Sequence, residues 1–153
     1  MQKKYELTDD KIRIYGEDAD LTYNFTLSRI RALHDIPMHN VKIGDFGGYI
    51  ESESNLSQEG DAWVAGNAQI FGSAIISDNA LVSGSAQVYG HAKVSGHAKV
   101  HGNAQVYGAA KIEENAQIRG HAEIKYLAII GASTIVDGYS IISDTIHKAP
   151  SDH

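Results

Sequence analysis

Histidine is the residue type of this chain that is best suited to chemistry, because an imidazole can act as a general base or as a metal ligand near neutral pH. The candidates are His91, His97, His101 and His121. A catalytic base must lie within hydrogen-bond reach of its substrate, and a catalytic zinc ion needs three protein ligands around it. Whether these side chains can meet depends on the elements that carry them.

Other groups of residues offer less to a metal or a phosphate. Gly44–Gly48 has neither the spacing nor the lysine of a phosphate-binding loop, so it predicts a turn. Cysteine is absent, which excludes disulfides and thiolate metal sites. Carboxylates near the middle of the chain either offer oxygen ligands to a hard cation or simply keep this surface solvated: Asp45, Glu51, Glu53, Glu59 and Asp61. We expect solvated carboxylates, with no metal and no cofactor.

Residues 60–143 consist of an uninterrupted six-residue repeat, as in GSAQVY, GHAKVS and GHAKVH. The third position is Ala in twelve of the fourteen hexads, and the fifth is always Val or Ile. Apolar residues at alternate positions predict a short strand with one buried face. Glycine followed by a small polar residue or histidine, which opens most hexads, is typical of a tight corner. Each hexad therefore predicts one strand and one corner.

Three hexads can close one triangular coil, and coils stack at roughly 4.8 Å. The sequence therefore predicts an all-β fold, a single-stranded parallel β-helix of about five coils over residues 51–143. Stacked coils have open strand edges at both ends. We expect residues 1–50 to form a small N-terminal β cap and residues 144–153 a C-terminal tail. The cap is predicted to contain strands at Lys4–Leu7, Ile12–Tyr15 and Phe25–Leu33, with turns around Asp9–Asp10 and Gly44–Gly48.

The N-terminal segments are more specific than the hexads. The chain begins with KKYELT, continues with RIRAL at Arg29–Leu33, and has GDFGGYIESESNLS before the hexads start. In these motifs it resembles a family of hexapeptide-repeat proteins common in phages and prophages, over nearly its whole length. The resemblance implies that the β-helix is left-handed and that the protein is a homotrimer encoded by a phage. It implies no general activity.

Stacking the repeat at three hexads per coil predicts columns of like side chains on each outer face. One face combines amide and aromatic columns: Gln69, Gln87 and Gln105 beside Phe71, Tyr89 and Tyr107. The same spacing places Glu51 and Glu53 above these columns, and Glu123 and Lys125 below them. An aromatic patch with a charged rim resembles a subunit interface. We predict that interface, with a water-facing ladder and a ligand platform as the alternatives.

The other outward positions carry two further signals. Lys93 and Lys111 would stack on a third face and repel each other, which is typical of a solvated surface. In the last coil Ile129, Ile135 and Ile141 all point outward. Exposed isoleucine requires a cover, either the C-terminal tail or a partner such as a second trimer.

The repeat also decides where the histidines lie. His91, His97 and His121 fall at three different corners, so we expect them not to converge within one subunit. His101 stacks near Lys99 and Arg119, which would lower its affinity for a proton. Acyltransferases of the hexapeptide superfamily enclose their donor with a loop that projects from a coil, and no loop interrupts these hexads. We predict a protein without catalytic residues, in which the four histidines at most line a ligand site.

Charge and the chain termini narrow the function classes. The chain has 13 basic and 19 acidic residues, a formal net charge of −6, which disfavours nucleic acid as a partner. No apolar run is long enough for a membrane span, and no secretory signal opens the sequence, so we expect a cytoplasmic protein, in the host cell if a phage encodes it. The leading hypothesis is a non-catalytic trimer that sequesters or blocks a host protein or a small signalling molecule, as anti-defence proteins do. The alternatives are an acyltransferase and a structural rod of a larger assembly.

Overall fold

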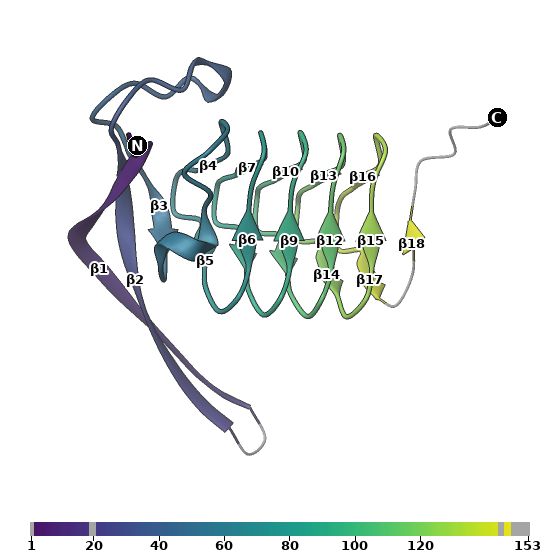
Figure 1. The fold of residues 1–153 in the computed structure, drawn as a ribbon. Helices are drawn as coiled ribbons and strands as arrows, with labels where there is room; N and C mark the ends of the chain where they lie inside the picture. Colours follow the sequence, from purple (N-terminus) through teal and green to yellow (C-terminus); the bar gives the residue numbers. More distant parts are fainter. Residues whose placement is uncertain (1, 19–20, 144–145, 148–153) are drawn as a thin grey trace.

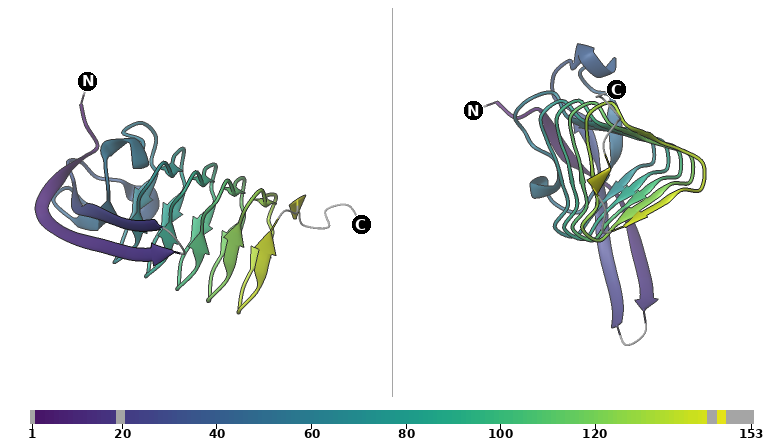
Figure 2. Two further views of the ribbon diagram at one scale, coloured as in Figure 1. Left: turned by 90° about the horizontal axis from the view of Figure 1, so that it is seen from below. Right: turned by 90° about the vertical axis from the view of Figure 1, so that its right-hand side faces the viewer.

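The computed structural model describes residues 2–18, 21–143 and 146–147, and its main feature is a stack of coils along one axis (Figure 1). Seen along that axis, the coils have a triangular outline (Figure 2). After the N-terminal strands, each side of the triangle contributes one short strand per coil. These strands are β3 (Phe46–Ile50), β4 (Trp63–Val64), β5 (Gln69–Ile70), β6 (Ile75–Ile76), β7 (Leu81–Val82), β8 (Gln87–Val88), β9 (Lys93–Val94), β10 (Lys99–Val100), β11 (Gln105–Val106), β12 (Lys111–Ile112), β13 (Gln117–Ile118), β14 (Glu123–Lys125), β15 (Ile129–Ile130), β16 (Ile135–Val136) and β17 (Ile141–Ser143).

The strands form three sheets, one for each side of the triangle. From β4 to β17, neighbouring strands of a sheet are parallel and one coil, or three hexads, apart, so Gln87 pairs with Gln105 and Val88 with Val106. In the first side the coil strands follow the order β3-β5-β8-β11-β14-β17. The second side is a sheet of order β16-β13-β10-β7-β4, and the third has the order β18-β15-β12-β9-β6, where β18 is Ile146–His147. The prediction of a parallel β-helix with three hexads in each coil is therefore confirmed.

The interior contains the third and fifth residues of the hexads. Ala98 and Val100, for example, are both fully buried, as are their counterparts in the coils above and below. The corners are equally tight. Gly84 has a left-handed φ of 67°, and a Cβ there would lie 2.9 Å from the backbone nitrogen of Gly102. Two corners have a carboxylate residue in this conformation instead. Asp78 accepts a hydrogen bond from the Gly96 N–H (2.9 Å), and Glu114 accepts one from the Ala132 N–H (2.7 Å).

The first coil is longer than the regular coils, since Leu56 pairs with Ile76 whereas Trp63 pairs with Leu81, so the additional residues lie between Leu56 and Trp63. A 3-10 turn, η2 (Glu53–Asn55), precedes them. Tyr49, and not Glu51, therefore pairs with Gln69.

The prediction that Glu51 and Glu53 lie above the amide and aromatic columns was wrong in its register, because the residues added between Leu56 and Trp63 shift the pairing. Glu51, whose N–H donates to the Ile70 carbonyl, precedes Phe71 at the head of the aromatic column. The side chain of Asn55 is fully buried, and its amide donates to the carbonyls of Gly72 (3.2 Å) and Ala74 (2.8 Å).

Two N-terminal strands add to the sheet that contains β3, which forms the first side of the triangle. β1 (Tyr5–Asp18) and β2 (Leu21–Ala32) form a long antiparallel hairpin, and β2 pairs antiparallel with β3. The hairpin runs away from the stack of coils (Figures 1 and 2). The turn predicted around Asp9–Asp10 was wrong. These residues lie within β1, where the register shifts between Leu7 and Lys11, as expected for a β-bulge.

The turn predicted at Gly44–Gly48 is only partly present. The chain turns at Lys42–Asp45, where the Asp45 N–H donates to the Lys42 carbonyl (2.9 Å). The next residues already belong to β3, which lies within the segment assigned to the cap and yet pairs in parallel with β5. Gly47 is required by close packing, since a Cβ there would overlap the Val64 carbonyl oxygen.

The start of the chain covers the first open coil. Lys4 is fully buried, and its ammonium group donates to the carbonyls of Ala62 (2.6 Å) and Gly60 (3.3 Å). The Tyr5 ring packs edge-on against Trp63, with centroids 6.5 Å apart. The backbone carbonyls at this end are therefore satisfied by side chains instead of by another coil.

At the other end, β18 (Ile146–His147) pairs with β15. Ile135 and Ile141 are 53% and 63% exposed, as the sequence indicates for outward positions. The C-terminal tail was one predicted cover for these isoleucines. Most of the tail, residues 144–145 and 148–153, lies outside the described residues.

The buried corner alanines lead to a first prediction. Ala98→Leu should lower the free energy of unfolding by about 2–3 kcal/mol, because added methyl groups overpack a closed interior. Ala109→Leu is the matched control, since Ala109 is an exposed corner residue. Chemical denaturation of both variants measures the difference, and equal stabilities would contradict the burial of the third hexad position.

Candidate interaction surface

The surface that differs most from a plain β-helix is the outer face of the eight-stranded sheet, which has the order β1-β2-β3-β5-β8-β11-β14-β17. We call it the ladder face. Its outward residues form two columns across the coils. One column contains Tyr49, Gln69, Gln87, Gln105 and Glu123, and the other contains Phe71, Tyr89, Tyr107 and Lys125. The columns that the sequence predicts from Gln69 and Phe71 downward are therefore formed.

The glutamines are linked to one another along their column. The Gln87 amide donates to Gln69 Oε1 at 2.7 Å, and the Gln105 amide donates to Gln87 Oε1 at 3.4 Å. A side-chain amide can do this because it contains both a donor and an acceptor. All three side chains are half-buried, so part of their hydrogen-bonding capacity still faces outward.

The aromatic column is a regular stack. Phe71 and Tyr89 have ring centroids 4.8 Å apart with an interplanar angle of 2°, and Tyr89 and Tyr107 follow at 4.9 Å and 5°. The Tyr107 hydroxyl donates to the Glu123 carboxylate, and Lys125 lies 3.4 Å from the same carboxylate. Burial, and then this hydrogen bond, raises the pKa of Tyr107, so the phenol keeps its proton at physiological pH.

The hairpin of β1 and β2 covers the aromatic column at its Phe71 end. The Phe25 ring lies 5.1 Å from Phe71, and Phe71 is only 5% exposed. Leu27 and Tyr49 are buried beside it, and the partly buried residues of this cluster are Ile12, Ile14, Phe25 and Tyr89. Phe71 is therefore inaccessible to another molecule within a single chain, whereas Tyr89 and Tyr107 remain half-exposed. Sequence reasoning missed the hairpin residues, although Ile12 and Ile14 alternate with polar residues as in a one-sided strand.

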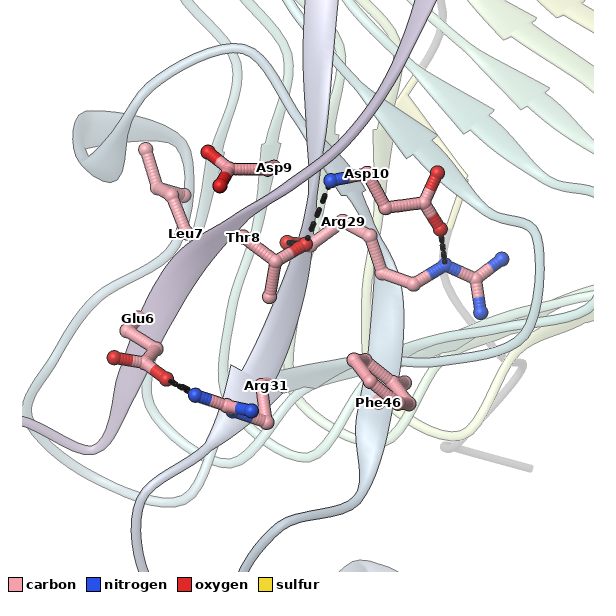
Figure 3. Close-up of a pocket in the computed structure, with 8 residues that line it drawn as sticks. All are labelled: Glu6, Leu7, Thr8, Asp9, Asp10, Arg29, Arg31 and Phe46. Carbon is pink, nitrogen blue, oxygen red and sulfur yellow. Dashed lines mark hydrogen bonds and ion pairs between the residues drawn. The ribbon is translucent and has the colours of Figure 1, made fainter.

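An open cavity of about 610 Å³ lies on the hairpin part of the same sheet, next to the β-bulge (Figure 3). Both of its arginines are neutralised by carboxylates. Arg31 pairs with Glu6, and Arg29 Nε lies 3.2 Å from Asp10. The Arg29 guanidinium also stacks 4.7 Å from the centroid of the Tyr49 ring. Cavity and ladder thus form a continuous surface with an aromatic centre and a charged edge.

The histidines stay apart, as predicted. His91, His97 and His121 lie at the corners defined by Gly108, Glu114 and Gly138, whose carbonyls accept their backbone N–H groups. His121 stacks on Tyr139 with centroids 4.7 Å apart. Within residues 2–18, 21–143 and 146–147 no three His, Asp or Glu side chains are grouped as a metal site.

His101 is half-buried, and its pKa is lowered. Burial is the largest cause, followed by the positive charges of Arg119 and Lys99. The lowered pKa predicted for His101 from the sequence is confirmed. The sequence indicated the effect of the two positive charges but not that of burial.

The corner residue His97 gains a neighbour that the sequence did not indicate. His39 lies in the short 3-10 turn η1 (Pro37–His39), and its Nε2 is 3.1 Å from the Asn79 carbonyl oxygen. This turn overhangs the second side of the β-helix and closes a groove of about 400 Å³. The groove is lined by Met38, His39, Asn79, His97, Lys99, Asn115 and Gln117. No repeat pattern indicates where such a turn will dock, so only the structure reveals that His39 and His97 line one groove.

Comparisons with known proteins add nothing to these observations, since no family model matches the chain and no curated protein matches it. In the part of the chain that the structure describes, no helix has the length and apolar character to cross a membrane.

The contact between the hairpin and the ladder can be tested. Phe25→Ala should lower the free energy of unfolding by about 1 kcal/mol, because it exposes part of the aromatic stack to water. It should also reduce the protection of the hairpin amides from hydrogen exchange. Tyr15→Ala, at a 69% exposed position of the same hairpin, is the control and should leave both quantities unchanged. Equal exchange in the two variants would contradict docking of the hairpin through Phe25.

Proposed function

We propose that this protein is a non-catalytic homotrimeric binding protein whose subunits associate through the ladder face. The observation that carries the proposal is the half-exposed stack of Tyr89 and Tyr107 beside the glutamine column. Aromatic side chains at the centre and charged pairs at the edge are the composition that protein interfaces favour. Closed symmetry then limits the size of the assembly.

The hairpin supports association through this face. An isolated two-stranded ribbon is at best marginally stable in water and needs a surface to pack on. Ile12, Ile14 and Phe25 form one apolar side of the ribbon, and all three are only partly buried by the chain's own ladder. A neighbouring subunit that packs against these side chains and against Tyr89 would complete their burial.

The partner that the trimer binds is proposed from the resemblance. A phage protein in the host cytoplasm would act by sequestering or blocking a host protein or a small signalling molecule. The separation of His91, His97 and His121 over three corners favours binding over catalysis, because an acid–base site needs its groups in reach of one substrate. The charged edges of the ladder face supply the polar rim that a binding surface needs.

The trimer interface is tested by a pair of charge substitutions. Tyr89→Asp should dissociate the trimer, because it places a carboxylate within the aromatic stack. Lys93→Asp changes an exposed residue of the third side and should leave the trimer intact. Light scattering distinguishes a subunit of 16.5 kDa from an assembly of three. If Tyr89→Asp remains trimeric, the interface is not the ladder face.

The binding function is tested separately from the trimer. The intact protein, expressed in bacteria that contain phage-defence systems, should retain a specific host protein or nucleotide through purification. The same protein should neither transfer acyl groups from acyl-CoA donors nor hydrate carbon dioxide. Either activity, if it is lost in His97→Ala or His101→Ala, would contradict a non-catalytic role.

A further inference from the structure

The groove under η1 differs from the rest of the surface in its charge. No Asp or Glu is among its seven lining residues, although the chain has 19 acidic residues against 13 basic ones. The cavity beside the β-bulge shows the contrast, since Glu6 and Asp10 neutralise its two arginines. Among the described residues, Lys99 has no carboxylate within ion-pair distance. Its ammonium group therefore takes part in no ion pair within this part of the chain, and Asp61, the carboxylate whose charge is felt at His39, is opposed there by Lys99 and Lys4.

The repeat arranges donors around that charge. Asn79, His97 and Asn115 occupy one corner column in three successive coils, and Lys99 and Gln117 pair directly on the adjacent strands β10 and β13. Amide, imidazole and ammonium groups can all donate hydrogen bonds to one oxyanion. They are held on the rigid backbone of the coils, so donors in successive coils are spaced by the stacking of the strands, roughly 4.8 Å.

The turn above the columns makes the surface concave. His39 is fixed by its contact with the Asn79 carbonyl, and burial is the largest cause of its lowered pKa, so at neutral pH it forms a neutral wall. Met38, 51% exposed, adds an apolar side chain at the mouth of the groove. A volume of about 400 Å³ lies in the range of small-molecule sites.

We propose that this groove binds the phosphate group of a phosphorylated small molecule, with Lys99 supplying the charge and His97, Asn115 and Gln117 supplying hydrogen bonds. A polymeric nucleic acid is disfavoured because the whole chain has a formal net charge of −6 and repels a long polyanion. The inference deepens the proposed function, on which it rests, by naming the class of small molecule that the trimer would hold.

The full-length protein is titrated with inorganic phosphate, pyrophosphate and AMP, and with adenosine as the uncharged comparison. Binding is followed by the NMR signals of the Asn115 and Gln117 side-chain amides and of the His97 ring. Saturable shifts of these signals with the phosphates, and none with adenosine, are the expected result. Tighter binding of AMP than of inorganic phosphate would assign the site to a phosphate ester, and the reverse would overturn that assignment in favour of the free ion. Shifts that spread over all basic residues, or that do not saturate, would overturn the proposal.

Lys99→Gln should weaken phosphate binding about tenfold or more, because it removes the charged hydrogen bond. Lys93→Gln is the matched control, since it changes the same exposed hexad position on another side and should leave the affinity unchanged. Equal affinities in the two variants would overturn the role of the groove. Light scattering on the same samples separates the two proposals, because loss of phosphate binding by an intact trimer contradicts this inference alone.

Discussion

The structure depends on one constraint, the parallel hydrogen bonding of each coil to the next at a fixed separation of three hexads. The backbone N–H of Gln87 donates to the carbonyl of Ala104 (3.0 Å), and that of Tyr89 donates to Val106 (2.9 Å). These bonds persist from coil to coil because the fully buried Ala and Val or Ile residues give the regular coils the same cross-section. A single coil cannot bury its own apolar face, so neighbouring coils must supply the packing.

This constraint also selects the outer residues, since it places like side chains directly above one another. Glutamines can satisfy one another, as Gln69 and Gln87 do, and aromatic rings can stack, as Phe71 and Tyr89 do. Lys93 and Lys111 are also paired, but like charges repel, and the pair is tolerable because both side chains are exposed to water. Columns of amides and rings therefore occupy the half-buried face, and columns of charge occupy the solvated one.

The sequence predicted the parts that repeat and missed the parts that do not. From Gln69 to Ser143 every strand partner follows from the three-hexad period, so the columns and the separation of the corner histidines could be worked out from the sequence. The first coil departs from this period because additional residues lie between Leu56 and Trp63. Within η2, the buried side chain of Asn55 replaces backbone hydrogen bonds that a regular hexad would make. The position of the hairpin depends on pairing between β2 and β3, and the coverage of Phe71 depends on that pairing. Such non-local contacts have no periodic signature.

A repeat of identical coils produces flat faces, so any hollow on them requires a segment that breaks the repeat. The groove under the turn that contains His39 meets that requirement, and the cavity beside the bulge of β1 is lined by N-terminal residues alone. The β-helix contributes rigid columns of donors such as His97 and Lys99, which lack a concave shape by themselves. The N-terminal residues contribute the concavity, and they lie over columns whose spacing is already fixed. The cap that protects the first open coil is thus also the element that shapes this groove, so the ligand that we propose for it would be selected at the N-terminal end of the stack of coils.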